Sequence, residues 1–482
     1  MYIYVAITQV VISTESSSLL FRNCSFLSER SGEYVVMKRK ARFKCLIALL
    51  LGLAMGLGST QLTASQGEPG DFPLDPAGLS PGPGPGGGSG VDQSPGRIRD
   101  IEERFATSLH NTRKGKATYY SADDGFEQIT GVPYDNLSCK NCHNKADIAD
   151  WQEPGCRDCH LGADNTPPDY TPPNEATCLG CHGRQNAEHG LFNDEDGDPI
   201  DVHRQLKMSC MDCHTEEEVH GDGNVYESML EAGVFKVSCA DAACHQNVLQ
   251  KPGRGNAASG KASQRAKKFH QKHLDTVDCS ACHVKSVLAC DSCHFDTEVA
   301  GIGKRFYRNI PQTGFKLLLN HHGKVRTATY QSLTWGTSVQ NVDDVGFYVL
   351  APYAAHTVTR ADDLECNDCH VKIKGKTIEG NAALKEYLET DGYITVNQWD
   401  ADAGEAGMLL PPTGIIPVPP DWRDALLFDF AYYLNDVADP VVQDPAGTTW
   451  GVLEAETVKM HMPYGTPLTA EQMDRLISGG GK

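Results

Sequence analysis

Apolar residues recur at helical spacing early in this chain of 482 residues. They are Ile98, Ile101, Phe105 and Leu109. A repeat of three to four residues is typical of a helix with one buried face. We therefore predict a helix over residues 97–114, with His110 near its C-terminal end.

The segment from about residue 306 to 353 has the pattern of β structure instead. Two apolar-rich runs, 315–319 and 324–330, flank Asn320-His-His-Gly323, and residues 347–350 form a further apolar run. Such runs on both sides of a glycine turn indicate a hairpin. We expect a small β-rich insert here.

The C-terminal residues 371–482 contain no cysteine. Short strand candidates lie at 393–396 and 426–428, and the proline-rich run 417–420 separates them. These short elements favour a small α+β cap over an independent catalytic domain.

A basic segment followed by an apolar one predicts a secretory leader. Residues 37–44 are rich in Lys and Arg, and the apolar run 45–58 is short for a transmembrane span. We expect Met37 to be the true start and 37–64 to be the signal peptide. An uncleaved membrane anchor remains the alternative.

The cysteines follow a repeated motif. Of eighteen cysteines, sixteen form eight pairs that are each followed by a histidine, whereas Cys24 and Cys45 lie in the leader. Seven motifs are C-x-x-C-H: Cys139, Cys142, His143; Cys156, Cys159, His160; Cys178, Cys181, His182; Cys210, Cys213, His214; Cys279, Cys282, His283; Cys290, Cys293, His294; and Cys366, Cys369, His370. The eighth has two extra residues and comprises Cys239, Cys244 and His245.

This spacing suits the covalent attachment of haem. Two thiols on one turn can each bond a haem vinyl group, and the histidine that follows can bind the iron. We predict eight haem c groups, with the sixteen cysteines as attachment sites and the eight histidines as proximal iron ligands. A disulfide framework or zinc sites would not need a histidine after every pair.

Ten histidines remain, enough to give each iron a second axial ligand. The expected distal ligands are His110, His189, His203, His220, His270, His273, His322 and His356. At most one of His321 and His322 should bind, because neighbouring side chains on a strand point to opposite faces. His461, in Met460-His-Met462, is not among the expected ligands.

The spacing of the motifs also brings haems close together. Only six residues separate His283 from Cys290, and twelve separate His143 from Cys156. Because a chain spans at most about 3.6 Å per residue, each of these two pairs of haems must be near neighbours. Such proximity favours rapid electron transfer between them.

The formal net charge of −20 argues against nucleic acid and anionic lipid as partners. We expect other redox proteins instead: a quinol-linked donor, and a terminal reductase or extracellular acceptor. Membrane contact is expected only if the leader is retained, and a homo-oligomer or filament stays open. Because haem c is attached outside the cytoplasmic membrane, we expect a periplasmic or outer-surface protein.

The motifs over residues 139–370 resemble those of octahaem and multihaem c-type cytochromes, and Cys239–His245 is similar to the C-x4-C-H variants of tetrahaem cytochrome c3. The resemblance implies haem binding without fixing activity. The group includes conduits as well as octahaem hydroxylamine oxidoreductase and octahaem nitrite and tetrathionate reductases. All eight motifs end in His, so the nitrite-reductase pattern with a proximal Lys is absent.

We therefore expect an electron carrier with eight mostly bis-His haems and no catalytic residues. The alternative is an oxidoreductase that acts on a small nitrogen or sulfur compound at one five-coordinate haem. The expected fold is mainly α and irregular, packed around haem. Its expected parts are a leader (1–64), a flexible Gly/Pro-rich linker (65–96), a haem domain (97–370) that contains the insert (306–353), and the cap (371–482).

Overall fold

The structure is a computed structural model of the chain. It describes residues 3–7, 24–30, 33–36, 94–112, 115, 120–121, 125–133, 156, 159–160, 173–239, 245, 268–301, 305–335, 344–435, 447–455 and 457–479. The predicted signal peptide, most of the predicted linker, the first motif (Cys139–His143) and Cys244 lie outside these residues.

The chain divides into two compact units, Met1–Gln66 and Gly67–Lys482. In the first unit, β1 (Ile3–Ile7), β2 (Cys24–Arg30) and β3 (Glu33–Val36) form an antiparallel sheet in the order β1-β2-β3. No helix within the described ranges is both long and apolar enough to cross a membrane.

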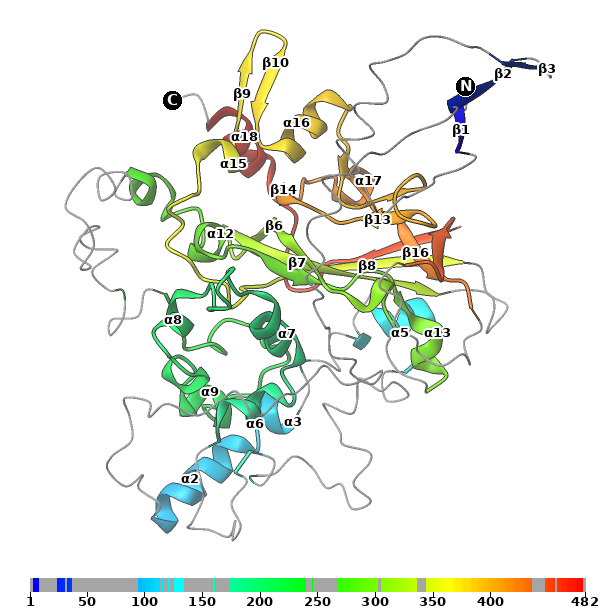
Figure 1. Ribbon diagram of the computed structural model, residues 1–482. Helices are drawn as coiled ribbons and strands as arrows, with labels where there is room; N and C mark the ends of the chain where they lie inside the picture. Colours follow the sequence, from blue (N-terminus) through cyan, green and yellow to red (C-terminus); the bar gives the residue numbers. More distant parts are fainter. Residues whose placement is uncertain are drawn as a thin grey trace, which may run out of the picture. The chain divides into compact units, whose positions relative to one another are not determined.

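A mixed sheet organises the second unit (Figure 1). Within the described residues its main order is β14-β6-β7-β8-β18, while β4 pairs with β6 and β5 with β7. The strands are β4 (Val287–Ala289), β5 (Cys293–His294), β6 (Gln312–His321), β7 (Lys324–Trp335), β8 (Val345–Pro352), β14 (Gly414–Pro417) and β18 (Thr457–His461).

The predicted hairpin is confirmed by β6 and β7, which pair antiparallel up to His321 and Lys324. His322 and Gly323 form its two-residue turn, with φ angles of 50° and 82°. Positive φ at both turn positions matches the twist of the two strands. The strand predicted at 347–350 is likewise confirmed within β8.

The segments expected to be an insert and a cap share this sheet. β14 pairs in parallel with β6, and β18 pairs in parallel with β8, so the C-terminal segment supplies both ends of the main order. The two short strands predicted in the cap are confirmed as β11 (Ile394–Thr395) and β15 (Leu426–Leu427), which pair with each other.

The largest apolar core lies around the central strands. Phe315, Leu317 and Leu319 of β6 are at most 1% exposed and pack with Tyr330 of β7 and Leu350 of β8. The C-terminal segment contributes Val418, Trp422 and Phe430 to the same core. Apolar contact therefore joins the insert to the C-terminal segment in one unit.

The predicted helix over 97–114 is interrupted at residues 106–108 and forms α2 (Pro95–Phe105) and α3 (Leu109–Thr112). Further helices in the first half are α5 (Phe126–Thr130), α6 (Glu175–Leu179), α7 (Gly183–Leu191), α8 (Val202–Gln205), η4 (Cys210–Asp212) and α9 (Glu216–His220).

In the second half, the helices are α12 (Cys279–His283), α13 (Phe295–Val299), η5 (Tyr307–Asn309), α15 (Cys366–Cys369), α16 (Ala382–Glu389), α17 (Trp422–Ala425) and α18 (Ala470–Ser478). The remaining strands are β9 (Val371–Lys374), β10 (Thr377–Gly380), β12 (Gln398–Asp400), β13 (Met408–Leu410), β16 (Phe430–Tyr433) and β17 (Trp450–Leu453). The described part is a mixed α/β structure with more sheet than the sequence suggested.

Candidate haem-binding sites

Most of the described motifs form a single helical turn. In four of them the histidine N–H donates to the carbonyl of the first cysteine, at 2.9–3.0 Å; these histidines are His160, His182, His214 and His370. A fifth motif, Cys279–His283, is the helix α12 itself. A helical turn carries both thiols and the histidine within one short stretch, as attachment to one porphyrin requires.

Polar residues just before several of these motifs cap the N-terminus of the helical turn. The Asn174 side chain accepts from Thr177 N before Cys178, and the Asp278 side chain accepts from Ser280 N at 2.9 Å. Ser209 and Asp212 form a reciprocal capping pair around Cys210. Side-chain caps satisfy the N–H groups that a first helical turn leaves without partners.

Six proximal histidines each face one of the predicted distal histidines. The ring centroids lie 6.1–6.4 Å apart in the pairs His110–His182, His160–His220, His203–His245, His214–His356, His270–His283 and His273–His370. The partners are only thirteen residues apart in His270–His283, but they come from distant parts of the chain in pairs such as His214–His356. This separation is nearly constant among the pairs, although the angle between the two rings varies from 16° to 70°.

The separation fits a metal ion held between the two rings. An iron bound to two imidazole nitrogens at about 2.0 Å, each about 1.1 Å from its ring centroid, would place the centroids about 6.2 Å apart. The described histidine pairs therefore fit the axial ligation of haem.

Several of these rings have one nitrogen already engaged. Nδ1 of His283 lies 2.9 Å from the Thr359 carbonyl oxygen, and Nδ1 of His370 lies 3.0 Å from that of Leu476. Nδ1 of His273 lies 2.9 Å from the Phe269 carbonyl oxygen. A carbonyl fixes the proton on Nδ1, which leaves Nε2 as the nitrogen that can bind iron.

Carboxylates take the same position at three other histidines. Nδ1 of His214 lies 2.8 Å from Glu218 Oε2, and Nδ1 of His356 lies 3.3 Å from Glu188 Oε2. Asp201 Oδ1 lies 3.5 Å from Nδ1 of His203. Burial alone would raise the pKa of Asp201, but hydrogen bonds, the first from His203, lower it to about 2. The sequence interpretation identified none of these three carboxylates.

Two histidines on one segment face the histidines of two different motifs. His270 faces His283, whereas His273, three residues later, faces His370. Thiols of different motifs also lie close together: Cys178 is beside Cys210, and Cys239 is beside Cys279. Porphyrins attached at these thiols would have their edges close together.

The other predicted distal ligands do not face a described proximal histidine. His189 lies on α7 with Nδ1 3.7 Å from Glu175, and burial lowers the pKa of His189 to about 4. His322 lies in the hairpin turn, where its ring centroid is 4.0 Å from that of His321. The expectation that the side chains of His321 and His322 point to opposite faces was wrong, because the strand ends at His321.

The motif Cys290–His294 differs from the others that the structure describes. Its last two residues form β5, and His294 N donates to the Arg305 carbonyl instead of to Cys290. His294 is fully buried, and its ring neighbours are Tyr432, Tyr433 and Trp450. Burial lowers the pKa of His294 to about 4.

The sequence just before Cys290 accounts for the strand conformation at the end of this motif. The buried strand Val287-Leu-Ala289 runs directly into Cys290, so the motif has no polar cap before it.

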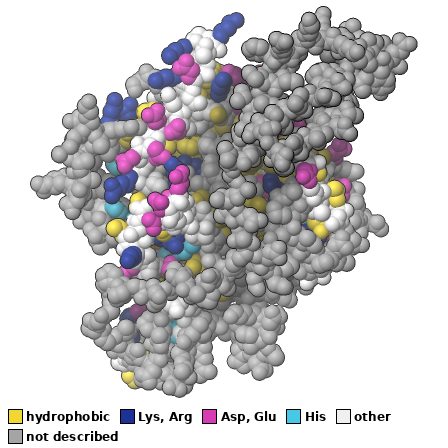
Figure 2. All heavy atoms as spheres, viewed as in Figure 1, with side chains coloured by type: hydrophobic (Ala, Val, Ile, Leu, Met, Phe, Trp, Pro, Cys, Tyr) yellow, Lys and Arg dark blue, Asp and Glu magenta, His cyan; other side chains and the backbone are white. Residues whose placement is uncertain are grey.

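The visible face of the molecule mixes acidic and basic side chains (Figure 2). Lys and Arg gather over the β9–β10 hairpin, which begins directly after His370 and is largely exposed.

Comparison with known proteins gives no assignment. No protein-family model matches the chain, and no curated protein or solved structure matches it. The functional assignment therefore rests on the motifs and on the geometry of the histidine pairs.

Proposed function

We propose that this protein is a multihaem c-type cytochrome that carries electrons through eight covalently bound, mostly bis-His haems. The observation that supports it most is the set of six histidine pairs at 6.1–6.4 Å. Each pair joins the histidine of an attachment motif to one from elsewhere in the chain.

Zinc explains this arrangement less well. Structural zinc usually takes four ligands, with cysteines and histidines on the same ion. Among the residues that the structure describes, no group of three or more His, Cys, Asp or Glu side chains is arranged to hold a metal. Two imidazoles on opposite sides of one ion suit haem iron, whose four other ligands come from the porphyrin.

The chain's residues have separate roles in this proposal. The cysteines would anchor each porphyrin, and the two imidazoles of a pair would both bind its iron. An iron held by both imidazoles would have no position left for a substrate. The bound haem supplies one-electron redox chemistry. The proximity of Cys178 to Cys210 would bring the two porphyrins attached there close together.

We further propose export to the periplasm or outer surface, with other redox proteins as donor and acceptor. Covalent haem attachment outside the cytoplasmic membrane and the predicted leader support this. The basic β9–β10 hairpin offers a docking surface for an acidic redox partner.

The decisive experiment is to count haems in protein matured with a haem-attachment system. A pyridine haemochrome assay and intact mass should give eight covalent haems per chain. Electron paramagnetic resonance (EPR) of the ferric protein should be dominated by low-spin signals. Absence of covalent haem would refute the proposal.

The second candidate is an oxidoreductase with one open iron. The motif Cys290–His294 favours it, because no histidine ring neighbours His294 among the described residues. A high-spin ferric signal that responds to nitrite or hydroxylamine would favour the enzyme. A fully low-spin protein would favour the carrier.

A further inference from the structure

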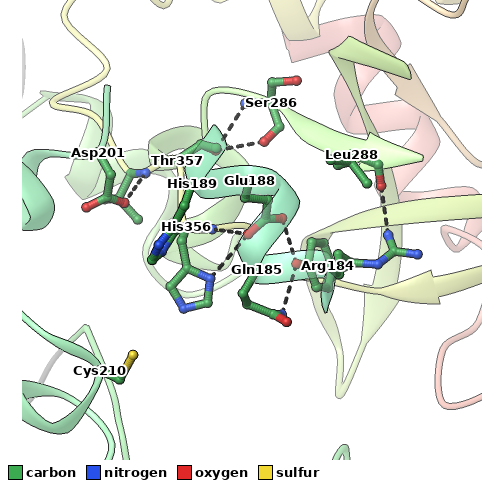
Figure 3. A network of polar contacts seen from close by, with 12 residues as sticks. Arg184, Gln185, Glu188, His189, Asp201, Cys210, Ser286, Leu288, His356 and Thr357 are labelled. Atoms are coloured by element: carbon green, nitrogen blue, oxygen red, sulfur yellow. Dashed lines mark hydrogen bonds and ion pairs between the residues drawn. The ribbon is translucent and has the colours of Figure 1, made fainter. Parts of the chain in front are cut away.

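The carboxylate of Glu188 is buried at the back of a distal histidine. Glu188 lies on α7 and is 1% exposed. Its Oε2 accepts from His356 N at 3.1 Å and lies 3.3 Å from His356 Nδ1, while Oε1 accepts from the Tyr353 hydroxyl at 2.6 Å. Figure 3 shows Glu188 between His356 and Gln185, whose amide donates to the Tyr353 hydroxyl. The carboxylate is therefore held in place on both sides.

A second carboxylate lies behind the opposite histidine. Oε2 of Glu218 on α9 lies 2.8 Å from Nδ1 of His214, and the Glu218 side chain is 6% exposed. Its Oε1 accepts from the backbone N–H groups of Lys236 and Val237. His214 and His356 face each other with ring centroids 6.4 Å apart. Both members of one pair thus have a buried carboxylate on Nδ1.

Another pair provides a neutral comparison within the same chain. His273 and His370 face each other at 6.2 Å, and the Nδ1 partners of both are carbonyl oxygens. The two pairs have the same ligand type and similar spacing. They differ in the charge of the group that accepts from Nδ1.

We propose that Glu188 and Glu218 are positioning residues that lower the redox potential of the haem attached at Cys210 and Cys213 below that of the haem attached at Cys366 and Cys369. This inference rests on the proposed function. A carboxylate that accepts the Nδ1 proton makes the imidazole a stronger electron donor through Nε2. Two such ligands stabilise the ferric charge more than the ferrous charge, and a buried carboxylate adds a favourable Coulomb interaction.

The test is a potentiometric titration of the haem-loaded protein followed by EPR, which separates low-spin components. Glu188→Gln and Glu218→Gln should each raise the midpoint potential of the same single component. Removing the hydrogen-bond partner of a metal-binding histidine commonly lowers metal affinity or activity about tenfold or more. If the preference of the site for ferric over ferrous iron falls tenfold, the midpoint potential of this one-electron couple rises by about 59 mV.

The matched control is Glu217→Gln. Glu217 is next to Glu218, but its side chain is 54% exposed and faces Lys236 at 4.0 Å. This variant loses the same charge without losing a contact with His214, so every midpoint should stay in place. If Glu188→Gln does not fold, Glu218→Gln carries the test, because it acts from a different helix on the opposite ligand.

The outcomes separate the two proposals. Full haem content with both Gln variants shifting one shared component supports the inference. Full haem content with no shift, or with shifts in two different components, overturns it and leaves the cytochrome proposal intact. A protein that binds no covalent haem refutes both.

Discussion

The imidazole rings of His160 and His220 lie nearly parallel, with an interplanar angle of 16° and centroids 6.1 Å apart. In His110–His182 and His203–His245 the rings are instead inclined by 65° and 70°. The angle between two axial imidazoles governs how far the ferric d orbitals split.

We therefore predict two classes of low-spin EPR signal. The His160–His220 haem should give a rhombic spectrum, and the two inclined pairs should give strongly anisotropic signals with a large highest g value. His220→Ala should remove one rhombic component and leave the strongly anisotropic signals unchanged. Loss of a strongly anisotropic signal in this variant would contradict the pairing of His160 with His220.

His270 and His273 should be axial ligands of two different irons, although only two residues separate them in the sequence. Replacing either with Ala removes one axial ligand, so each variant should convert one haem to a high-spin, ligand-accessible form. The two variants control for each other, because the affected components should differ. Loss of the same component in both would disprove the separate pairing with His283 and His370.

The stretched motif should hold a haem of its own. Replacing Cys239 and Cys244 together with Ala should lower the haem content from eight to seven, since both thioether positions are lost. Intact mass and the haemochrome assay measure this directly. An unchanged haem mass in the double variant would mean that the motif is not used.

The cap of α12 should contribute to stability. Asp278 accepts from Ser280 N at 2.9 Å and from the Ser280 hydroxyl at 2.6 Å. Asp278→Ala should reduce the free energy of unfolding by about 1 kcal/mol, the usual effect of losing an N-cap. Chemical denaturation measures it, and Asp275→Ala, at an exposed position nearby, is the control expected to cause little change.

The contact between the sheet and the C-terminal segment is testable at Gly346. A Cβ there would lie 2.5 Å from the ring of Phe430, which is 2% exposed. Gly346→Ala should destabilise the protein by about 1–3 kcal/mol, because a packed core resists added volume. Gly190→Ala is the control, because nothing lies within 4 Å of a Cβ added at Gly190. The free energy of unfolding of this variant should be unchanged or slightly higher, since Ala favours a helix more than Gly does.

The sequence predicted the local elements well. The hairpin 315–330 and the strands near 394 and 426 are confirmed, because each depends on apolar periodicity and nearby turn residues. The helix over 97–114 was predicted as one piece, but the chain leaves the helical pattern at residues 106–108.

The pairing of histidines could not be predicted in the same way. The sequence identified the candidate ligands but not their partners: His270 faces the histidine of the next motif, whereas His356, which precedes Cys366, faces His214. Such pairs depend on how distant segments pack, which a local pattern does not encode. For the same reason, the parallel pairing of β14 and β18 with the insert was not foreseen.

The supporting carboxylates differ in how far the sequence could reveal them. Glu218 lies four residues after His214, within reach on one helical turn, so its pairing could have been anticipated. Glu188 meets His356 only through tertiary packing. The strand character of Cys293–His294 also had a local signal, namely the apolar run before Cys290.

The origin of β14 and β18 bears on how the protein matures. Because both outer strands of the main order come from the C-terminal segment, β6 and β8 keep unpaired edges until the last part of the chain arrives. Exposed strand edges invite pairing with other chains. A polypeptide that crosses a membrane from its N-terminus would receive its haems on a chain whose sheet is still open. Slow translocation or a shortage of haem would then give the open sheet more time to aggregate. Truncated forms that lack the C-terminal strands would be the first to precipitate.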